Sequence, residues 1–440
     1  MPVPGQQQGR PGRDQGRHQI DGDHRRAPLT ATGTPVRVVP AGTTLGAYAR
    51  HPATATGAGP QGGDTVEDTE PRSTEPRNTE PRNTEPKAAE AAAADGAQPS
   101  PVPKRRKRLR RTRRIALAVL LVLLVPLLTA ETALRINYTG DPADGTYTRN
   151  RDAIWLGHAW VDGRKDDADL AAFARRVKAT GIRDLYVHTG PMEHDGTLPK
   201  SLYPRARWLV DAVHRELPGV RVQAFLGDVL ATESPDGMRL EKAATRAAVV
   251  DSARQVLDVG YDGVHLDLEP LHSGDRNYLT LLDDVRAVTR ARDAQLSVAA
   301  HQIDPLPGFH SFWGTVAGHP KWWSQAFFGQ VARRVDQIAV MSYDTMQPLE
   351  SLYGGYVAQQ TALALEATPP TTHLLMGLPF YHENRFGHWN HAETVAAAVR
   401  GVRLGLSRTD ADRERFGVAA YIDFAATEED WASYRDGWVR

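Results

Sequence analysis

The segment Asp262-Gly263-Val264-His265-Leu266-Asp267-Leu268-Glu269 reads as an apolar strand with three ionisable side chains at alternate positions. Successive side chains of a strand point to opposite faces. The valine and two leucines therefore share one face, and His265, Asp267 and Glu269 share the other. Three ionisable groups in a row on a buried face are costly unless they have partners or a chemical task. We therefore expect a functional site on this strand.

The charge distribution and the cysteine count of the chain exclude several kinds of site. Lys and Arg together number 53, as do Asp and Glu, but eleven residues at 104–114 are almost all cationic. The remainder of the chain is therefore net acidic. The sequence has no cysteine, which excludes disulfides, a thiolate nucleophile and cysteine-ligated metals.

Residues 1–103 have the composition of a disordered tail. They are rich in Gly, Pro, Gln, Arg and Thr and show no apolar periodicity, so ordering them would cost more entropy than burial returns. A five-residue repeat, Thr-Glu-Pro-Arg followed by one residue, runs through 69–87. We expect an extended spacer there, or alternatively a segment that binds a partner.

A membrane anchor is expected at 104–136. The run 115–130 is almost entirely Leu, Val, Ala and Ile, and it directly follows the basic run. Its position makes a membrane surface a better partner for the basic run than nucleic acid. The positive-inside rule places the tail in the cytoplasm and the C-terminal part outside the cell membrane, on a single span. The alternative is a signal peptide cleaved near Ala130 or Ala133, which would release the protein.

From about residue 153 apolar strand-like runs alternate with amphipathic helical segments. The predicted strands are 153–159, 183–188, 220–226, 263–269, 295–300, 337–343, 373–380 and 417–423. The predicted helices are 170–179, 207–216, 239–259, 278–290, 325–334, 357–367, 392–402 and 428–438. Eight such units over roughly 290 residues predict an α/β fold of the (β/α)8, or TIM, barrel type at 150–440. A doubly wound sheet is disfavoured, because no Gly-rich phosphate turn follows any strand.

The two carboxyl groups near the end of the fourth strand suggest acid catalysis. Asp267 and Glu269 are two residues apart, which is roughly 6–7 Å along a strand. Two such carboxyls do not easily both ionise, so one retains a proton at neutral pH. A general acid requires such a retained proton.

Three motifs resemble those of glycoside hydrolase family 18, the chitinases and their relatives. Asp262-Gly263-x-x-x-Asp267-x-Glu269 resembles the signature of the family's fourth strand. Met341-Ser342-Tyr343-Asp344 on strand six resembles its Met-x-Tyr-Asp motif, and Gly377-Leu378-Pro379-Phe380-Tyr381 is a weaker match on strand seven. The motifs occur in the family's order, and the resemblance covers about 153–440.

The resemblance implies a mechanism without a cofactor. Glu269 would protonate the glycosidic oxygen, and Asp267 would orient the substrate's acetamido group while that group's oxygen attacks the anomeric carbon. Tyr343 and Asp344 would contact the same acetamido group. The family retains the anomeric configuration without a protein nucleophile. The implied partner is a glycan with an N-acetylated amino sugar before the cleaved bond, such as chitin, peptidoglycan or an N-glycan.

The chain departs from the family pattern at two positions. The family usually has a third acid where this chain has His265, which would alter the protons held around Asp267. A protonated His265 would favour ionised Asp267, whereas a neutral one would act through hydrogen bonds. Strand eight of chitinases commonly ends in a tryptophan beneath the sugar, and here Tyr421 takes that place.

The remaining candidates lie on or beside the predicted strands. Besides the four catalytic candidates, we expect substrate contacts from His265, Asp262, Met341, Tyr381, Tyr421, Trp160, His301 and Asp423. The segment 301–320 is long for a loop and could wall the site. Trp322 and Trp323 read more readily as loop packing than as a sugar subsite.

Two other classes of function remain open at this point. The first is a glycan-binding barrel without activity, although Glu269 is present. The second is a metal-dependent hydrolase that uses Asp267 and Glu269 with His158, His188, His265 and His301. No tight ligand motif supports a metal, and we expect none.

Overall fold

The computed structural model describes residues 104–232, 234–318 and 320–440. The predicted disordered tail at 1–103, with its five-residue repeat, lies outside the described residues. Side chains of α1 are described from residue 111 onward, apart from residue 123.

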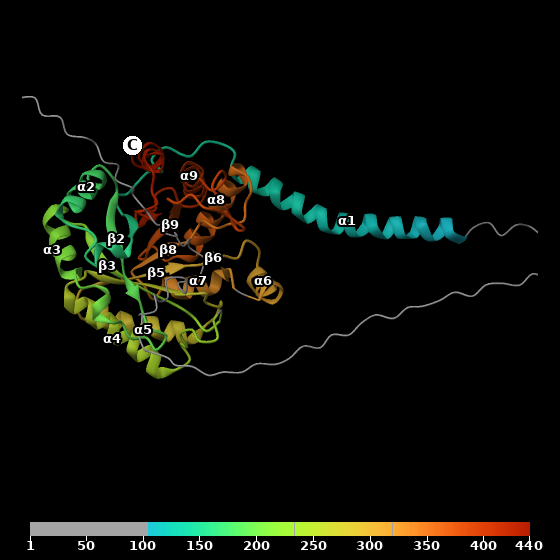
Figure 1. Ribbon diagram of the computed structural model, residues 1–440. Helices are drawn as coiled ribbons and strands as arrows, with labels where there is room; N and C mark the ends of the chain where they lie inside the picture. The colour runs from blue at the N-terminus through green and yellow to red at the C-terminus, as the bar shows by residue number, and fades with distance from the viewer. Residues whose placement is uncertain (1–103, 233, 319) are drawn as a thin grey trace, which may run out of the picture. The chain divides into compact units, whose positions relative to one another are not determined.

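The predicted barrel is confirmed (Figure 1). Eight parallel strands close on themselves in chain order, with β12 pairing β1. The strands are β1 (Asp152–Leu156), β2 (Ile182–Pro191), β3 (Arg221–Val229), β4 (Gly263–Glu269), β5 (Gln295–Ala300), β8 (Gln337–Val340), β9 (His373–Pro379) and β12 (Phe416–Tyr421). Parallel strands covered on both faces read as nearly continuous apolar runs, which explains why the sequence located them within a few residues.

Strand β8 is the one whose predicted end differs in a way that affects the site. It ends at Val340 rather than Tyr343. The chain leaves the sheet there, and Asp344 adopts the left-handed conformation with a φ of 56°. A non-glycine residue in that region is strained and needs surrounding contacts to hold it.

Helices cover the outside of the barrel. They are α2 (Asp167–Val177), α3 (Ala206–Glu216), α4 (Ala243–Val259), α5 (Arg276–Arg290), α7 (Gln325–Ala332), α8 (Glu350–Ala367), α9 (Val395–Thr409) and α10 (Glu428–Tyr434). Caps fix several starts: the Asp166 side chain accepts from the backbone N–H groups of Ala168 and Asp169, which begins α2. The outward faces of the strands pack against these helices in one continuous apolar core.

The segment 301–320 is not the open loop that its length predicted. It contains β6 (Gln302–Ile303) and α6 (Phe309–Ala317), and β6 pairs with β7 (Trp322–Trp323). Both tryptophans are buried, and their indole N–H groups donate to the Tyr356 hydroxyl and the Leu271 carbonyl. These two residues therefore pack the protein interior, and they do not form a sugar subsite.

Helix α1 (Lys104–Asn137) includes the predicted apolar segment. Its part Arg111–Asn137 is long and apolar enough to cross a membrane, by length and composition. Its C-terminal turn packs on α8 at Gly355, where an added Cβ would lie 1.9 Å from the Leu134 carbonyl oxygen. The Arg408 guanidinium donates to the carbonyl oxygens of Asn137 and Thr139, which have no helical partner. The end of α1 is thus joined directly to the barrel's outer layer.

Candidate active site

The end of β4 brings Asp267 and Glu269 to the end of the barrel where TIM-barrel sites form. Asp267 is enclosed enough that burial raises the pKa of its carboxyl to about 7. One of its oxygens, Oδ1, is buried and has no hydrogen-bond partner among the described residues. A buried oxygen without a partner is unusual in a folded protein and is available to accept a bond from a ligand.

Glu269 lies at the last position of β4 and is more accessible, with 19% of its side chain exposed. The Nε2 atom of His301, which follows β5, is 3.6 Å from Glu269 Oε1. The same nitrogen accepts a hydrogen bond from the Leu271 backbone N–H at 3.3 Å. Glu269 and His301, which were predicted separately as site residues, are therefore brought together at the rim.

His265 occupies a deeper layer of the barrel and is fully buried. The Trp155 indole N–H donates to its Nε2 at 3.1 Å, so Nδ1 carries the proton and faces Ser297 Oγ at 2.8 Å. Its ring stacks on Tyr186 with centroids 3.8 Å apart. Burial lowers the pKa of His265 to about 3, so the imidazole is neutral. The expected substrate contact by His265 is wrong, because both ring nitrogens already serve interior partners.

Tyr343 is placed by a glycine on the neighbouring strand. A Cβ at Gly377 in β9 would lie 2.7 Å from the Tyr343 ring, so any other residue there would displace the tyrosine. The ring stacks on Tyr421 with centroids 5.4 Å apart and meets Tyr381 edge-on. Met341 belongs to the same small apolar cluster. The three tyrosines and Met341, all predicted site residues, therefore lie together.

Asp344 is the most heavily bonded of the predicted residues. Its Oδ1 accepts from the Tyr381 hydroxyl at 2.7 Å, and its Oδ2 accepts from Arg385 Nη2 at 2.9 Å. Lys321 Nζ donates to its backbone carbonyl at 2.6 Å. Arg385 was not among the predicted residues. It lies on β10 (Asn384–Arg385), which forms an antiparallel hairpin with β11 (His388–Trp389).

Three other predicted contacts are corrected by the structure. Asp262 precedes β4, at the opposite end of the barrel, where it accepts from the Val222 N–H and lies 2.8 Å from the His214 ring. Trp160 is buried against Phe173 and donates its indole N–H to Asp423 Oδ2 at 2.7 Å. Asp262, Trp160 and Asp423 therefore tie parts of the scaffold together.

Of the histidines proposed for a metal-dependent hydrolase, His301 lies beside Glu269, but among the described residues they do not form one ligand group with Asp267 and Glu269. Among the described residues, the group of His and acidic side chains close enough to share an ion is Asp344, His388 and Glu393. Their oxygens are already used: those of Glu393 accept from the N–H groups of Asp344 and Thr345 and from the Thr345 hydroxyl. The ammonium of Lys321 and the guanidinium of Arg385 also lie beside this group, which disfavours a further cation.

Comparison with known families identifies the part of the barrel from β4 to α10. The model of glycosyl hydrolases family 18 matches residues 233–434, which include β4, Tyr343 and Asp344. The chain therefore contains a family 18 glycosyl hydrolase domain, as the motifs predicted, and it is a glycosidase. A comparison with curated protein sequences gave no match.

Solved structures similar to this chain include the spore cortex-lytic enzyme SleL of Bacillus cereus. It is 12% identical over 66% of this chain and 74% of its own, with a TM-score of 0.47. A class V chitinase of Pseudomonas fluorescens is 14% identical over 65% of this chain and 98% of its own, with a TM-score of 0.44. A chitinase of Chromobacterium violaceum is 12% identical over 65% and 98%, with a TM-score of 0.46.

Proposed function

We propose that the barrel cleaves the glycosidic bond that follows an N-acetylated amino sugar, by a retaining mechanism in which the substrate's acetamido group is the nucleophile. The observation that carries the proposal is the pair at the end of β4: a carboxyl oxygen of Asp267 that is buried without a partner among the described residues, two residues before the more accessible Glu269. The first suits a fixed hydrogen bond, and the second suits proton exchange with a leaving group.

The first step would break the bond between the anomeric carbon and the leaving oxygen. Glu269 gives its proton to that oxygen, and the acetamido carbonyl oxygen forms a new bond to the anomeric carbon. The positive charge that develops on the acetamido group is balanced by ionised Asp267, whose Oδ1 accepts the N–H. Placing a charge where charge develops in the transition state is a large source of catalysis.

The second step would restore the acetamido group. Glu269, now ionised, takes a proton from water, and the water oxygen attacks the anomeric carbon as the bond to the acetamido oxygen breaks. Two displacements at one carbon leave its configuration unchanged. Tyr343, Tyr381 and Tyr421 pack against one another, and Tyr421, which is the least buried of the three, offers an aromatic face to a sugar ring.

The decisive experiment incubates the full chain in detergent with chitin oligomers, peptidoglycan and N-glycans and reads the products by mass and by the anomer first formed. We expect cleavage of at least one substrate with retention. Glu269→Gln should lower the rate by roughly 10²–10⁴-fold, the usual contribution of a general acid. Glu366→Gln, an exposed residue near the end of α8 that leads into β9, serves as the matched control.

The role of the acetamido group has its own test. Fully deacetylated glucosamine oligomers should resist cleavage, because they lack the attacking oxygen. Cleavage of those oligomers at a similar rate, or inversion of the anomer, would exclude substrate assistance. If none of the three N-acetylated substrates is cleaved by the wild-type chain, the proposed specificity fails.

A further inference from the structure

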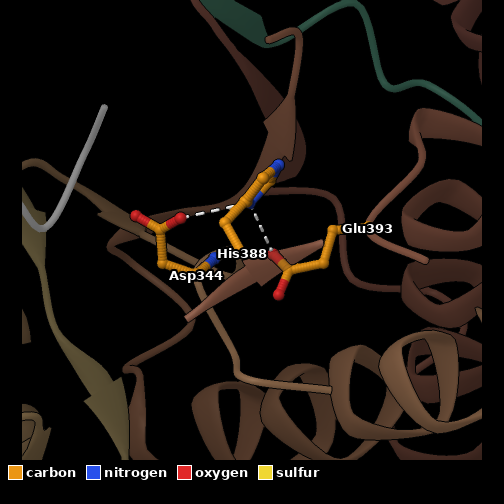
Figure 2. A group of neighbouring side chains, drawn as sticks. All are labelled: Asp344, His388 and Glu393. Atoms are coloured by element: carbon orange, nitrogen blue, oxygen red, sulfur yellow. Dashed lines mark hydrogen bonds and ion pairs between the residues drawn. The ribbon is translucent and has the colours of Figure 1, made fainter. Parts of the chain in front are cut away.

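The hairpin of β10 and β11 carries a histidine into a set of acidic groups beside the site. Figure 2 shows the His388 imidazole between the carboxylates of Asp344 and Glu393. Its Nδ1 lies 3.1 Å from Asp344 Oδ1 and 3.1 Å from Glu393 Oε2. The side chains of His388 and Glu393 are fully buried, whereas 12% of the Asp344 side chain is exposed. Asp344 thus connects a buried pair to the site.

Glu393 fixes the backbone on which two proposed substrate contacts depend. Its Oε2 accepts the Asp344 N–H at 2.7 Å, and its Oε1 accepts the Thr345 N–H at 2.8 Å and the Thr345 hydroxyl at 2.9 Å. These bonds hold Asp344 in its left-handed conformation. Tyr343 immediately precedes that position, so the same bonds fix where its ring points.

The β10–β11 hairpin is held in place by the segment that also contains Tyr343 and Asp344. The Met346 N–H donates to the Gly387 carbonyl at 3.0 Å, and Arg385 pairs with His388 across the hairpin. Arg385 and His388 therefore reach Asp344 together, one at each carboxylate oxygen. The Tyr381 ring stacks on the imidazole with centroids 4.4 Å apart.

Charges around His388 come from every element packed on it. The groups that face it are Asp344 after β8, Glu393 before α9, Glu383 and Arg385 on the hairpin side, Lys321 before β7 and Tyr381 after β9. With His388 protonated, three cations face three carboxylates and the set is neutral. With His388 neutral, the buried carboxylates of Asp344 and Glu393 lose the cation between them.

We propose that His388, as an imidazolium, and Glu393 are positioning residues that together clamp the Tyr343–Asp344 turn in its substrate-binding conformation. This proposal rests on the proposed function, since it assigns Tyr343 and Asp344 to the sugar. Burial alone would lower the pKa of His388, but the carboxylates of Asp344 and Glu393, each 3.1 Å from Nδ1, outweigh burial and raise it to about 9. The clamp is therefore closed at neutral pH and releases in alkali.

The test separates binding from turnover by using the Glu269→Gln full chain, in which the proposed acid cannot titrate. Binding of the N-acetylglucosamine tetramer is measured by calorimetry from pH 7 to 10. We expect affinity to fall through about pH 9, as His388 loses its proton. Adding His388→Gln should weaken binding at pH 7 by about tenfold or more and remove the step near pH 9, because the charge is absent throughout.

Two further variants keep the outcome specific. His388→Lys restores a cation and should recover most of the affinity while moving the step to higher pH. His214→Gln is the matched control, because His214 also contacts a carboxylate, at 2.8 Å, but at the other end of the barrel. Circular dichroism and thermal unfolding establish that each variant is folded.

The results that would overturn the proposal are distinct from those that would overturn the proposed function. A pH step that survives in folded His388→Gln, or an NMR titration of the His388 ring with a midpoint near 6.5, contradicts the clamp. If the wild-type chain bound one equivalent of Zn²⁺ and His388→Gln did not, the ligand of the His388 ring would be a metal ion and not the proposed proton. If the tetramer does not bind at any pH, the substrate assignment fails, while the NMR titration still decides the charge of His388.

Discussion

His265 is the residue at which this chain departs most clearly from the family pattern, and its chemistry is that of a neutral scaffold residue. Its Nε2 accepts from Trp155, and its Nδ1 faces Ser297, whose hydroxyl donates to Gln223. No acid lies below Asp267 on the inward face of β4 to share its proton. Asp267 must therefore titrate without the acidic neighbour that the family usually supplies.

This arrangement predicts an acidic limit to activity. Burial raises the pKa of Asp267 to about 7, and the proposed mechanism needs its ionised form. Because protonated Asp267 cannot serve in this mechanism, kcat/KM rises with pH through about 7 and falls about tenfold per unit below it. The check is a pH–rate profile of the full chain on whichever N-acetylated oligomer it cleaves.

Two variants assign that acidic limit. Asp267→Asn removes the titrating group, so the residual kcat/KM of this variant should not show the fall below about pH 7. His265→Gln should leave the midpoint in place, because the histidine is uncharged across this range with a pKa lowered to about 3. A midpoint that moves by a full pH unit in folded His265→Gln would mean that His265 shares the proton after all.

The sequence located the motif residues but not the groups that hold them. Asp267, Glu269, Tyr343 and Asp344 stand out because ionisable or aromatic residues end apolar strands. His388 and Glu393 carry no such local signal, since they meet Asp344 only after a hairpin with two-residue strands folds back. The polar run 382–391 with Gly387 as a turn was the one hint available.

Conversely, Asp262 and Trp160 look functional in the sequence, but the hydrogen bonds that they make in the structure show that they are structural residues.

At the scale of elements, strands were easier to predict than the pieces between them. Buried parallel strands are read from composition alone, so all eight were found. Helix α8 begins at Glu350, seven residues before the predicted start, because Gly354 and Gly355 weaken the helical pattern there. These glycines matter for tertiary packing, because α1 packs against α8 where they lack side chains.

That packing predicts opposite effects of one substitution at two glycines. In an isolated helix, Gly→Ala stabilises by about 0.5–1 kcal/mol. Gly314→Ala on α6 should follow that rule, since nothing lies within 4 Å of its added Cβ. Gly355→Ala should instead destabilise the contact with α1, because overpacking costs about 1–3 kcal/mol.

Hydrogen exchange of the full chain in detergent measures this contact locally. Amides of residues 131–138 should exchange faster in Gly355→Ala than in the wild type and should be unchanged in Gly314→Ala. Equal protection in all three proteins would show that the end of α1 does not depend on α8.

At the scale of the whole molecule, the contact between the end of α1 and α8 links the barrel to the segment expected to cross the membrane. Arg111–Asn137 is long enough to cross a bilayer with some tilt, and it continues as helix through Ala130 and Ala133. A protease acting there would have to unwind the helix and detach its last turn from α8. We therefore propose that α1 is an uncleaved single-pass anchor. It would keep the glycosidase at the external face of the cell membrane, with residues 1–103 on the cytoplasmic side.

The absence of cysteine makes this topology directly measurable. A cysteine at Ala287, which is exposed on α5, should react with a membrane-impermeant maleimide on intact cells. A cysteine at Ala89 should react only after the membrane is opened, because the basic run at 104–114 favours the cytoplasmic side. The reverse labelling pattern would invert the topology. Barrel recovered from the medium with a new N-terminus after Ala130 or Ala133 would instead establish secretion, and deletion of 115–130 gives the reference for an unanchored chain.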